Sequence, residues 1–222
     1  MLRLSEADHA EVSAAIAAAE AGSAGEIIAI ATDLSDPYHD VGLHYAVLVA
    51  FTAFALFAFA PWLLGGMFTR LHGWADPSQR DLLLLLLSIV LLAFVGTLLL
   101  MKWMPLRLAL TPGATKTRRV RRRAISLFKA AADSRTTGRT GIMIYLSMGE
   151  RRAEIIGDEA IVAVTDPATW GEAMTKLVLG IKAHRPADGI VAAIGEIGAV
   201  LAQHFPRDAA DVNEIPDKLI EL

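Results

Sequence analysis

The sequence predicts a mixed α/β domain that is interrupted, after its first strand, by a helical hairpin in a membrane. Two apolar runs of lipid length, residues 43–64 and 82–101, lie in the middle of the 222-residue chain. Residues 26–32, EIIAIAT, precede them and are typical of a short buried strand. Residues 141–161, GIMIYLSMGERRAEIIGDEAI, follow them and are typical of two antiparallel strands joined by a turn.

The two apolar runs are long enough to cross a bilayer as helices. Hydrophobic residues make up 54% of the chain and the mean hydropathy is +0.45, both high for a water-soluble protein. The only strongly polar side chain of the first run is His44, and the second contains nothing more polar than Ser88 and Thr97. At about 1.5 Å per residue, each run spans a hydrocarbon core of about 30 Å. The alternative, two buried helices of a large soluble core, is disfavoured because LLLLLLSIVLLAFVGTLLL has no polar face.

The charges are unevenly distributed and predict how the hairpin is oriented. Residues 1–42 carry one Arg against eight acids, whereas residues 102–139 carry eleven Lys and Arg against one acid. Residues 65–81, between the spans, contain only Arg70 and Arg80. Because Lys and Arg accumulate on the cytoplasmic side of a membrane, we expect a multi-pass protein of the inner (plasma) membrane with both termini cytoplasmic. Residues 65–81 would then form a short external turn.

The first forty residues argue against a signal peptide, and the lack of cysteine excludes several kinds of site. The first forty residues are acidic and polar, unlike the basic and then apolar start of a signal peptide, so we expect the first span to be retained. The absence of cysteine excludes disulfides, thiol catalysis and cysteine metal sites.

The segments on either side of the hairpin complete each other. Neither part can bury a core alone, because one helix and one strand are too few. We therefore expect one domain built from residues 1–42 and 105–222, with residues 43–104 as the inserted hairpin. Helical periodicity and strand composition predict four helices, at 5–21, 115–132, 167–183 and 187–204, and three strands, at 26–32, 142–147 and 151–156.

Five segments carry a resemblance to a known family. They are AGEIIAIATDLSDPY with Asp40, RTGIMIYLSMGERRAEIIGDEAI, Trp170, IGEIGAVLAQHFP and NEIPDKLIEL. Together they resemble the bacterial membrane-inserted branch of the TPM-domain family, which is related to thylakoid acid-phosphatase-like and photosystem repair proteins. The resemblance implies a three-layer αβα sandwich of TPM type with a two-helix transmembrane hairpin after the first strand. The family's long acidic loop is largely missing here, so its phosphatase and calcium-binding activities carry over poorly.

Common catalytic motifs are absent from the sequence. Ser147 lies in YLSMG, which lacks the first glycine of a nucleophile elbow. Gly195 and Gly198 lie within a helical stripe and indicate close helix packing, not a phosphate-binding loop. The six histidines form no pair at i, i+4 and no HExxH, which argues against a zinc site.

Carboxylates at strand ends are the candidate metal ligands. Asp33, Asp36 and Asp40 follow the first strand, and Asp158 and Glu159 follow the third. Should these strand ends meet, the oxygens of Asp33, Asp36, Asp158 and Glu159 would suit Ca²⁺ or Mg²⁺. The alternative is structural: Asp33 and Asp36 shape a turn, and Asp158 caps a helix. The resemblance places Asp158 near the part of the family fold associated with metal or phosphate chemistry.

A basic run, TRRVRRR, follows the second span. It contains Arg118, Arg119, Arg121, Arg122 and Arg123. We expect these residues to fix the topology and to contact lipid head groups. Nucleic acid is not an expected partner, because aromatic residues that would stack on bases are missing around the run.

Two functions remain open from the sequence. The first is a non-enzymatic membrane protein whose cytoplasmic TPM-like domain binds a protein partner and supports assembly or maintenance of a membrane complex. The second is a divalent-metal-dependent phosphatase at the membrane surface. A transporter is poorly supported, because neither span contains an Asp, Glu, Lys or Arg that would line a pathway. No catalytic residue is predicted, and Ca²⁺ or Mg²⁺ is the only candidate cofactor.

Overall fold

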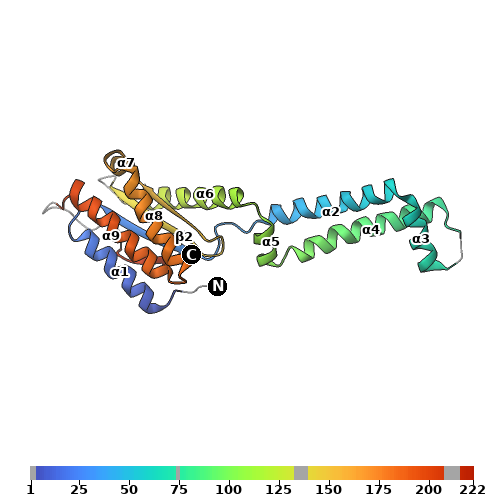
Figure 1. Cartoon of the computed structure of the whole chain (residues 1–222), viewed down its shortest axis with the longest axis horizontal. Coiled ribbons are helices and arrows are strands. Elements are labelled where there is room, and N and C mark those ends of the chain that lie inside the picture. Colours follow the sequence, from blue (N-terminus) through green and yellow to red (C-terminus); the bar gives the residue numbers. More distant parts are fainter. Residues whose placement is uncertain (1–3, 74–75, 133–139, 208–215) are drawn as a thin grey trace. The chain divides into compact units, whose positions relative to one another are not determined.

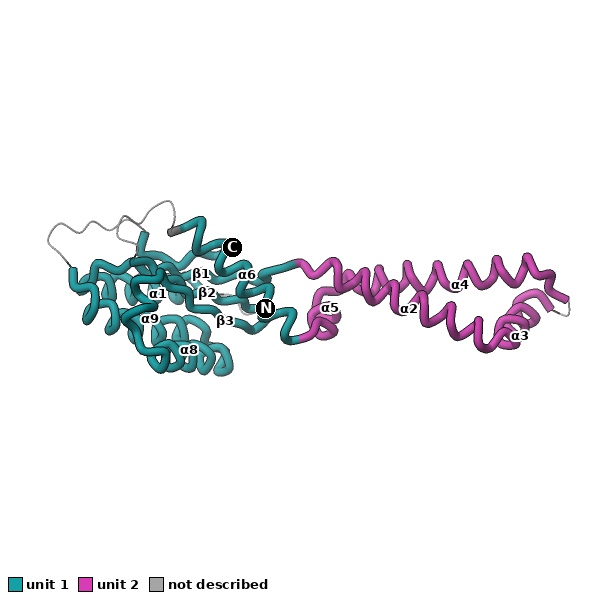
Figure 2. The backbone as a smooth tube through the Cα atoms, turned by 90° about the horizontal axis from the view of Figure 1, so that it is seen from above, with its two compact units in different colours: residues 1–36, 113–222 teal, residues 37–112 magenta. Residues whose placement is uncertain are grey.

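The computed structural model describes residues 4–73, 76–132, 140–207 and 216–222 and divides the chain into two compact units. Residues 1–36 and 113–222 form one unit, here called the α/β domain, and residues 37–112 form the other, here called the helical hairpin (Figure 2). The two predicted spans both lie within the helical hairpin.

A four-stranded mixed sheet forms the centre of the α/β domain, in the order β3-β2-β1-β4. β1 (Glu26–Thr32) pairs in parallel with β2 (Gly141–Ser147), so the strand before the hairpin joins the first strand after it. β3 (Arg152–Gly157) returns antiparallel to β2, and the short β4 (Leu219–Glu221) pairs in parallel with β1. The predicted α/β class and three of the strands are confirmed; β4 was not predicted.

Helices cover both faces of the sheet (Figure 1), and every residue of β1 and β2 is therefore buried. On one face, α1 (Glu6–Glu20), α8 (Pro167–Lys182) and α9 (Pro186–His204) share a core with Ile27, Ala29, Ile142 and Ile144. On the other face, α6 (Gly113–Ala132) packs against the opposite side of the same two strands, with the residues Val120, Ala124, Phe128, Ile28, Ile30, Met143 and Tyr145. A short helix, α7 (Glu159–Val164), follows β3.

The first helix begins where the sequence predicted. Ser5 and Asp8 form a capping box: the Ser5 Oγ accepts a hydrogen bond from the Asp8 amide at 3.2 Å, and the Asp8 carboxylate accepts one from the Ser5 amide at 2.7 Å. The apolar residues Val12 and Ile16 are then buried one turn apart against the sheet.

The helical hairpin contains two long helices, α2 (His39–Phe59) and α4 (Gln79–Leu100), with α3 (Pro61–His72) between them and α5 (Met104–Leu110) after them. By length and composition, α2 and α4 could each cross a membrane. α4 has no buried residue, which differs from the core helix of a soluble protein.

Two details of the hairpin differ from the prediction. The first apolar helix ends at Phe59 instead of residue 64, because Pro61 has no amide hydrogen and starts a new helix, α3. Residues 65–81 were predicted as a short turn, but α3 extends through their first half and α4 begins at a Ser78 capping box.

The missed helix α5 carries a buried arginine. The Arg107 guanidinium donates to the Met101 carbonyl at 2.7 Å and to the Pro37 carbonyl at 2.6 Å. These bonds tie the two ends of the helical hairpin together at its base.

The two glycines of the GEIG segment in α9 have different environments. A Cβ on Gly198 would lie 2.7 Å from the Ala19 Cβ of α1, whereas a Cβ on Gly195 would meet nothing within 4 Å. Close helix packing, as predicted from the sequence, therefore applies to Gly198 and not to Gly195.

We expect Gly198→Ala to lower the free energy of unfolding by about 1 to 3 kcal/mol, because α1 and α9 must separate. Gly195→Ala is the matched control in the same helix and should raise it by about 0.5 to 1 kcal/mol, because alanine favours helix. Denaturant unfolding of the full chain in detergent, followed by circular dichroism, measures both. Equal effects of the two substitutions would contradict this packing.

Candidate functional site

The carboxyl ends of β1, β2 and β4 lie at one edge of the sheet, because these three strands are mutually parallel. A cavity of about 350 Å³ opens there and is called the carboxyl-edge cavity below. Its lining comes from residue 4, from the ends of β1 and β4 with the residues that follow them, and from the β2–β3 turn. It consists of Leu4, Ala31, Thr32, Asp33, Met148, Glu221 and Leu222. Open parallel sheets commonly bind ligands at this edge.

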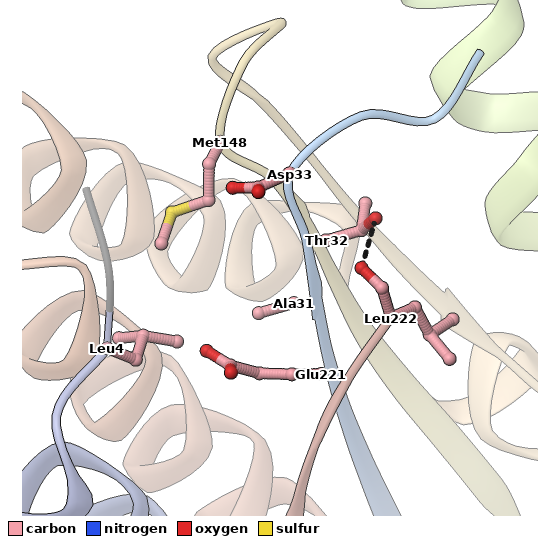
Figure 3. Close-up of a pocket in the computed structure, with 7 residues that line it drawn as sticks. All are labelled: Leu4, Ala31, Thr32, Asp33, Met148, Glu221 and Leu222. Atoms are coloured by element: carbon pink, nitrogen blue, oxygen red, sulfur yellow. Dashed lines mark hydrogen bonds between the residues drawn. The ribbon is translucent and has the colours of Figure 1, made fainter. Parts of the chain in front are cut away.

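Four side chains surround the open space of the cavity (Figure 3). Asp33 and Met148 lie on one side of it, and Glu221 and Leu4 lie on the other. The cavity therefore combines two carboxylates with two apolar side chains.

Backbone hydrogen bonds hold these residues in place. The amides of Met148 and Gly149 donate to the carbonyls of Thr32 and Asp33, at 2.9 and 2.8 Å. A Cβ on Gly149 would lie 2.6 Å from the Asp33 carbonyl oxygen, so only glycine allows the turn to approach so closely. On the other side of β1, the Leu222 amide donates to the Ala31 carbonyl at 3.0 Å.

The two acids of the cavity differ in their surroundings. Nε2 of His9, on α1, lies 3.5 Å from the Glu221 carboxylate, whose side chain is half exposed. The Asp33 side chain is exposed and makes no hydrogen bond or ion pair with the described residues. Asp33 is thus available to a ligand from outside.

A buried polar network supports the loop after β1. The Glu150 carboxylate accepts hydrogen bonds from the Ser147 hydroxyl and, at 2.9 Å, from the Ser35 amide. The Ser35 hydroxyl lies 2.9 Å from the Tyr145 hydroxyl, and burial raises the pKa of Tyr145. Ser147 is fully buried in this network, which agrees with the sequence-based argument against a serine nucleophile.

Asp36 continues the same loop and forms an ion pair with α6. Its carboxylate accepts a hydrogen bond from the Arg119 guanidinium at 2.7 Å, and both side chains are partly buried. Asp36 therefore fixes the loop to α6, whereas Asp33 lines the cavity.

Asp158 and Glu159 lie at the opposite edge of the sheet from Asp33. The Asp158 carboxylate accepts from the Gly141 amide at 2.9 Å, at the beginning of β2. Since β1 runs parallel to β2, the two pairs of predicted ligands are separated by a strand of seven residues, about 20 Å. Among the described residues, no three His, Asp or Glu side chains are grouped as a metal site would need.

A second polar cluster lies at that opposite edge, near the start of β1. A small pocket of about 80 Å³ is lined there by residues including Glu20, Glu26, Arg207 and Asp217. The Glu20 carboxylate accepts a hydrogen bond from the Ile27 amide at 2.7 Å. Burial is the largest cause that raises the pKa of Glu20, to about 8. The hydrogen bond from the Ile27 amide opposes the rise, and the nearby charges of Glu26 and Asp217 add to it.

The sequence reasoning identified Asp33 but missed Leu4, Met148 and Glu221. Glu221 belongs to a strand of three residues that has no clear alternation of its own. Its one available signal was the closing segment NEIPDKLIEL, which contributes to the family resemblance.

The fold is similar to that of a solved structure, whereas the sequence comparisons found no match. No family model and no curated protein matches the sequence. The structure is similar to that of the BA42 protein from the psychrophilic bacterium Bizionia argentinensis, with a TM-score of 0.56, 16% sequence identity and coverage of 99% of this chain and 95% of that chain. The fold is TPM-like. At this identity the similarity extends to the fold alone.

The proton on Glu20 should make stability depend on pH. The pKa of this carboxyl is about 8 in the folded chain, against an ordinary value of 4.5, so the folded state keeps a proton that the unfolded state loses between these values. The free energy of unfolding should therefore fall as pH rises from about 4.5 to about 8.

In Glu20→Gln this part of the pH dependence should disappear. We expect the stability of the variant relative to the unchanged chain to increase by about 1 to 3 kcal/mol between pH 5 and pH 8, measured by denaturant unfolding. Glu11→Gln, at an exposed position of the same helix, is the matched control and should stay within about 0.5 kcal/mol of the unchanged chain throughout. A loss of stability in Glu20→Gln that is the same at every pH would contradict the proposed role of the Glu20 proton.

Proposed function

We propose that the protein is a membrane-anchored binding protein: α2 and α4 cross the membrane, and the α/β domain binds a protein partner through the carboxyl-edge cavity. This role would serve the assembly or maintenance of a membrane complex. The observation that carries it is the pairing of two carboxylates with two apolar side chains in one cavity.

The exposure of the apolar helices supports the membrane part of the proposal. Large apolar side chains along both helices are exposed, among them Leu48, Phe51, Leu87 and Leu92. Apolar surfaces of this extent mark lipid or protein contacts. The excess of Lys and Arg after α4 favours a cytoplasmic α/β domain with both termini inside, in the inner membrane of a bacterial cell.

The lining of the cavity suggests the chemistry of the bound group. A lysine or arginine side chain has an apolar stem and a cationic head. The stem would pack on Leu4 and Met148, and the head would donate hydrogen bonds to the carboxylate oxygens of Asp33 and Glu221. A volume of about 350 Å³ is at the lower end for ligand pockets and fits one such side chain with its neighbours better than a large cofactor.

A divalent-metal-dependent phosphatase is the second candidate function. The presence of Asp33 and Glu221 in one cavity favours it, because paired carboxylates also suit Mg²⁺ or Ca²⁺. Two observations weigh against it: Asp36 is engaged by Arg119, and Asp158 and Glu159 lie at the other edge of the sheet. The binding protein is therefore the stronger proposal.

The absence of cysteine makes the orientation directly measurable. We expect an impermeant maleimide to label Gln79→Cys in intact spheroplasts, and to label Gln203→Cys only after permeabilisation. The physical reason is that residue 79 begins α4 at its external end, whereas residue 203 belongs to the cytoplasmic domain. Labelling in the reverse order would show the opposite orientation, and recovery of the chain in the soluble fraction would refute the membrane hairpin.

The cavity should bind a cation through its two acids. The probe is a short capped peptide with one lysine, titrated calorimetrically into the full chain in detergent at low salt. Asp33→Asn and Glu221→Gln should each weaken binding by about 3- to 10-fold, because each removes one charged hydrogen-bond acceptor. Glu172→Gln, an exposed acid on α8, is the matched control and should leave the affinity unchanged.

Two further titrations separate the candidate functions. A peptide with glutamate in place of lysine should not bind, and equal binding of both peptides would refute the proposed chemistry. Saturable binding of Mg²⁺ that disappears in Asp33→Asn, together with hydrolysis of a phosphate ester, would favour the phosphatase instead.

A further inference from the structure

The helix α6 presents an unusually basic surface. Its twenty residues contain seven cations and no acid, although the whole chain has a net charge of −3. The buried stripe of α6, formed by Val120, Ala124 and Phe128, packs on the sheet. The seven cations therefore differ in how far they lie from the buried stripe around the helix.

Several of these cations are engaged within the domain. Arg119 pairs with Asp36 at 2.7 Å. The charge of Arg121 acts on Glu154, where it opposes the rise in pKa that burial causes. These two residues serve the structure of the domain.

Three of the other five cations form a stripe on the outer side of the helix. Arg118, Arg122 and Lys129 are exposed, together with Ile125, which is 37% exposed. Their spacing of four, three and four residues aligns them along one line, since a helix turns once in 3.6 residues. By the same periodicity this line lies nearly opposite the buried Val120. Within the described chain, the three cations make no hydrogen bond or ion pair.

We infer that this outer stripe of α6, defined as Arg118, Arg122, Ile125 and Lys129, docks on anionic lipid head groups. The stripe is complementary in charge to an anionic membrane surface, and a single exposed isoleucine among cations suits the boundary between head groups and acyl chains. The inference rests on the proposed membrane hairpin. Only residues 101–112 connect α4 to α6, so the chain keeps the start of α6 within about 40 Å of the end of the span.

This docking goes beyond a topological signal. The positive-inside rule needs cations near a span, but it does not need them aligned on one face of a folded helix. Aromatic residues that would stack on bases are missing from the stripe, so a lipid surface fits it better than RNA.

The test uses the full chain with one cysteine, Ser126→Cys, which lies on the exposed side of α6 next to the stripe. A spin label at this position is measured in nanodiscs of phosphatidylcholine alone and of phosphatidylcholine with phosphatidylglycerol. Collisions with a nickel-chelating lipid report whether the helix lies on the membrane. A label at Gln203→Cys on α9, which covers the other face of the sheet, is the control position.

We expect the label at residue 126, but not at residue 203, to contact the chelating lipid when phosphatidylglycerol is present. The triple variant Arg118→Gln, Arg122→Gln, Lys129→Gln should shift the ratio of docked to undocked helix by about 100-fold toward the undocked form. The charge-matched triple variant Lys182→Gln, Arg185→Gln, Lys218→Gln, at exposed cations outside α6, should dock as before. Rising salt should also release the helix.

Each outcome separates this inference from the proposed function. A chain that enters nanodiscs but shows the same label contacts in both lipid mixtures overturns the docking and leaves the membrane hairpin intact. A chain that does not enter nanodiscs overturns the hairpin itself. Binding of a single-stranded RNA that the α6 triple variant abolishes, without any effect of phosphatidylglycerol, would assign the stripe to nucleic acid and also overturn the inference.

Discussion

The parallel pairing of β1 with β2 is the constraint on which the rest of the structure depends. The two strands are separated by residues 33–140, 108 in all, yet they match residue by residue from Glu26 opposite Gly141 to Thr32 opposite Ser147. Parallel neighbours need a crossover, because the chain must return to the other edge of the sheet. α6 is that crossover, and the Arg119–Asp36 ion pair ties it to the loop that leaves β1.

The direction of this pairing also decides which polar groups can meet. With β1 and β2 parallel, the carboxyl ends of β1, β2 and β4 share one edge, and Asp33 and Glu221 line one cavity. Had β1 run antiparallel to β2, Asp33 and Asp158 would have shared an edge. The sequence shows where β1, β2 and β3 lie, but local patterns do not reveal the relative direction of strands that are far apart in the chain.

The elements that the sequence predicted share a strong local signal. β1, β2, the long apolar helices and α9 each have a continuous or periodic apolar pattern. β4 lacks one, because its three residues form a strand only by pairing with Ala29, Ile30 and Ala31. The short length of β4 also explains the hydrogen bond made by Glu20. The Ile27 amide lies beyond the reach of β4, and the buried Glu20 carboxyl is its acceptor instead.

The insertion of the helical hairpin between β1 and β2 sets an order for biogenesis. EIIAIAT, fully buried in the finished sheet, leaves the ribosome long before its partner strand exists. At about 5 to 20 residues per second, this wait lasts on the order of 5 to 20 seconds. During that time an apolar strand with unpaired edges stays open to chaperones or to aggregation. The sheet closes only after both apolar helices have been synthesised, so a folded α/β domain marks a chain whose helical hairpin is already complete.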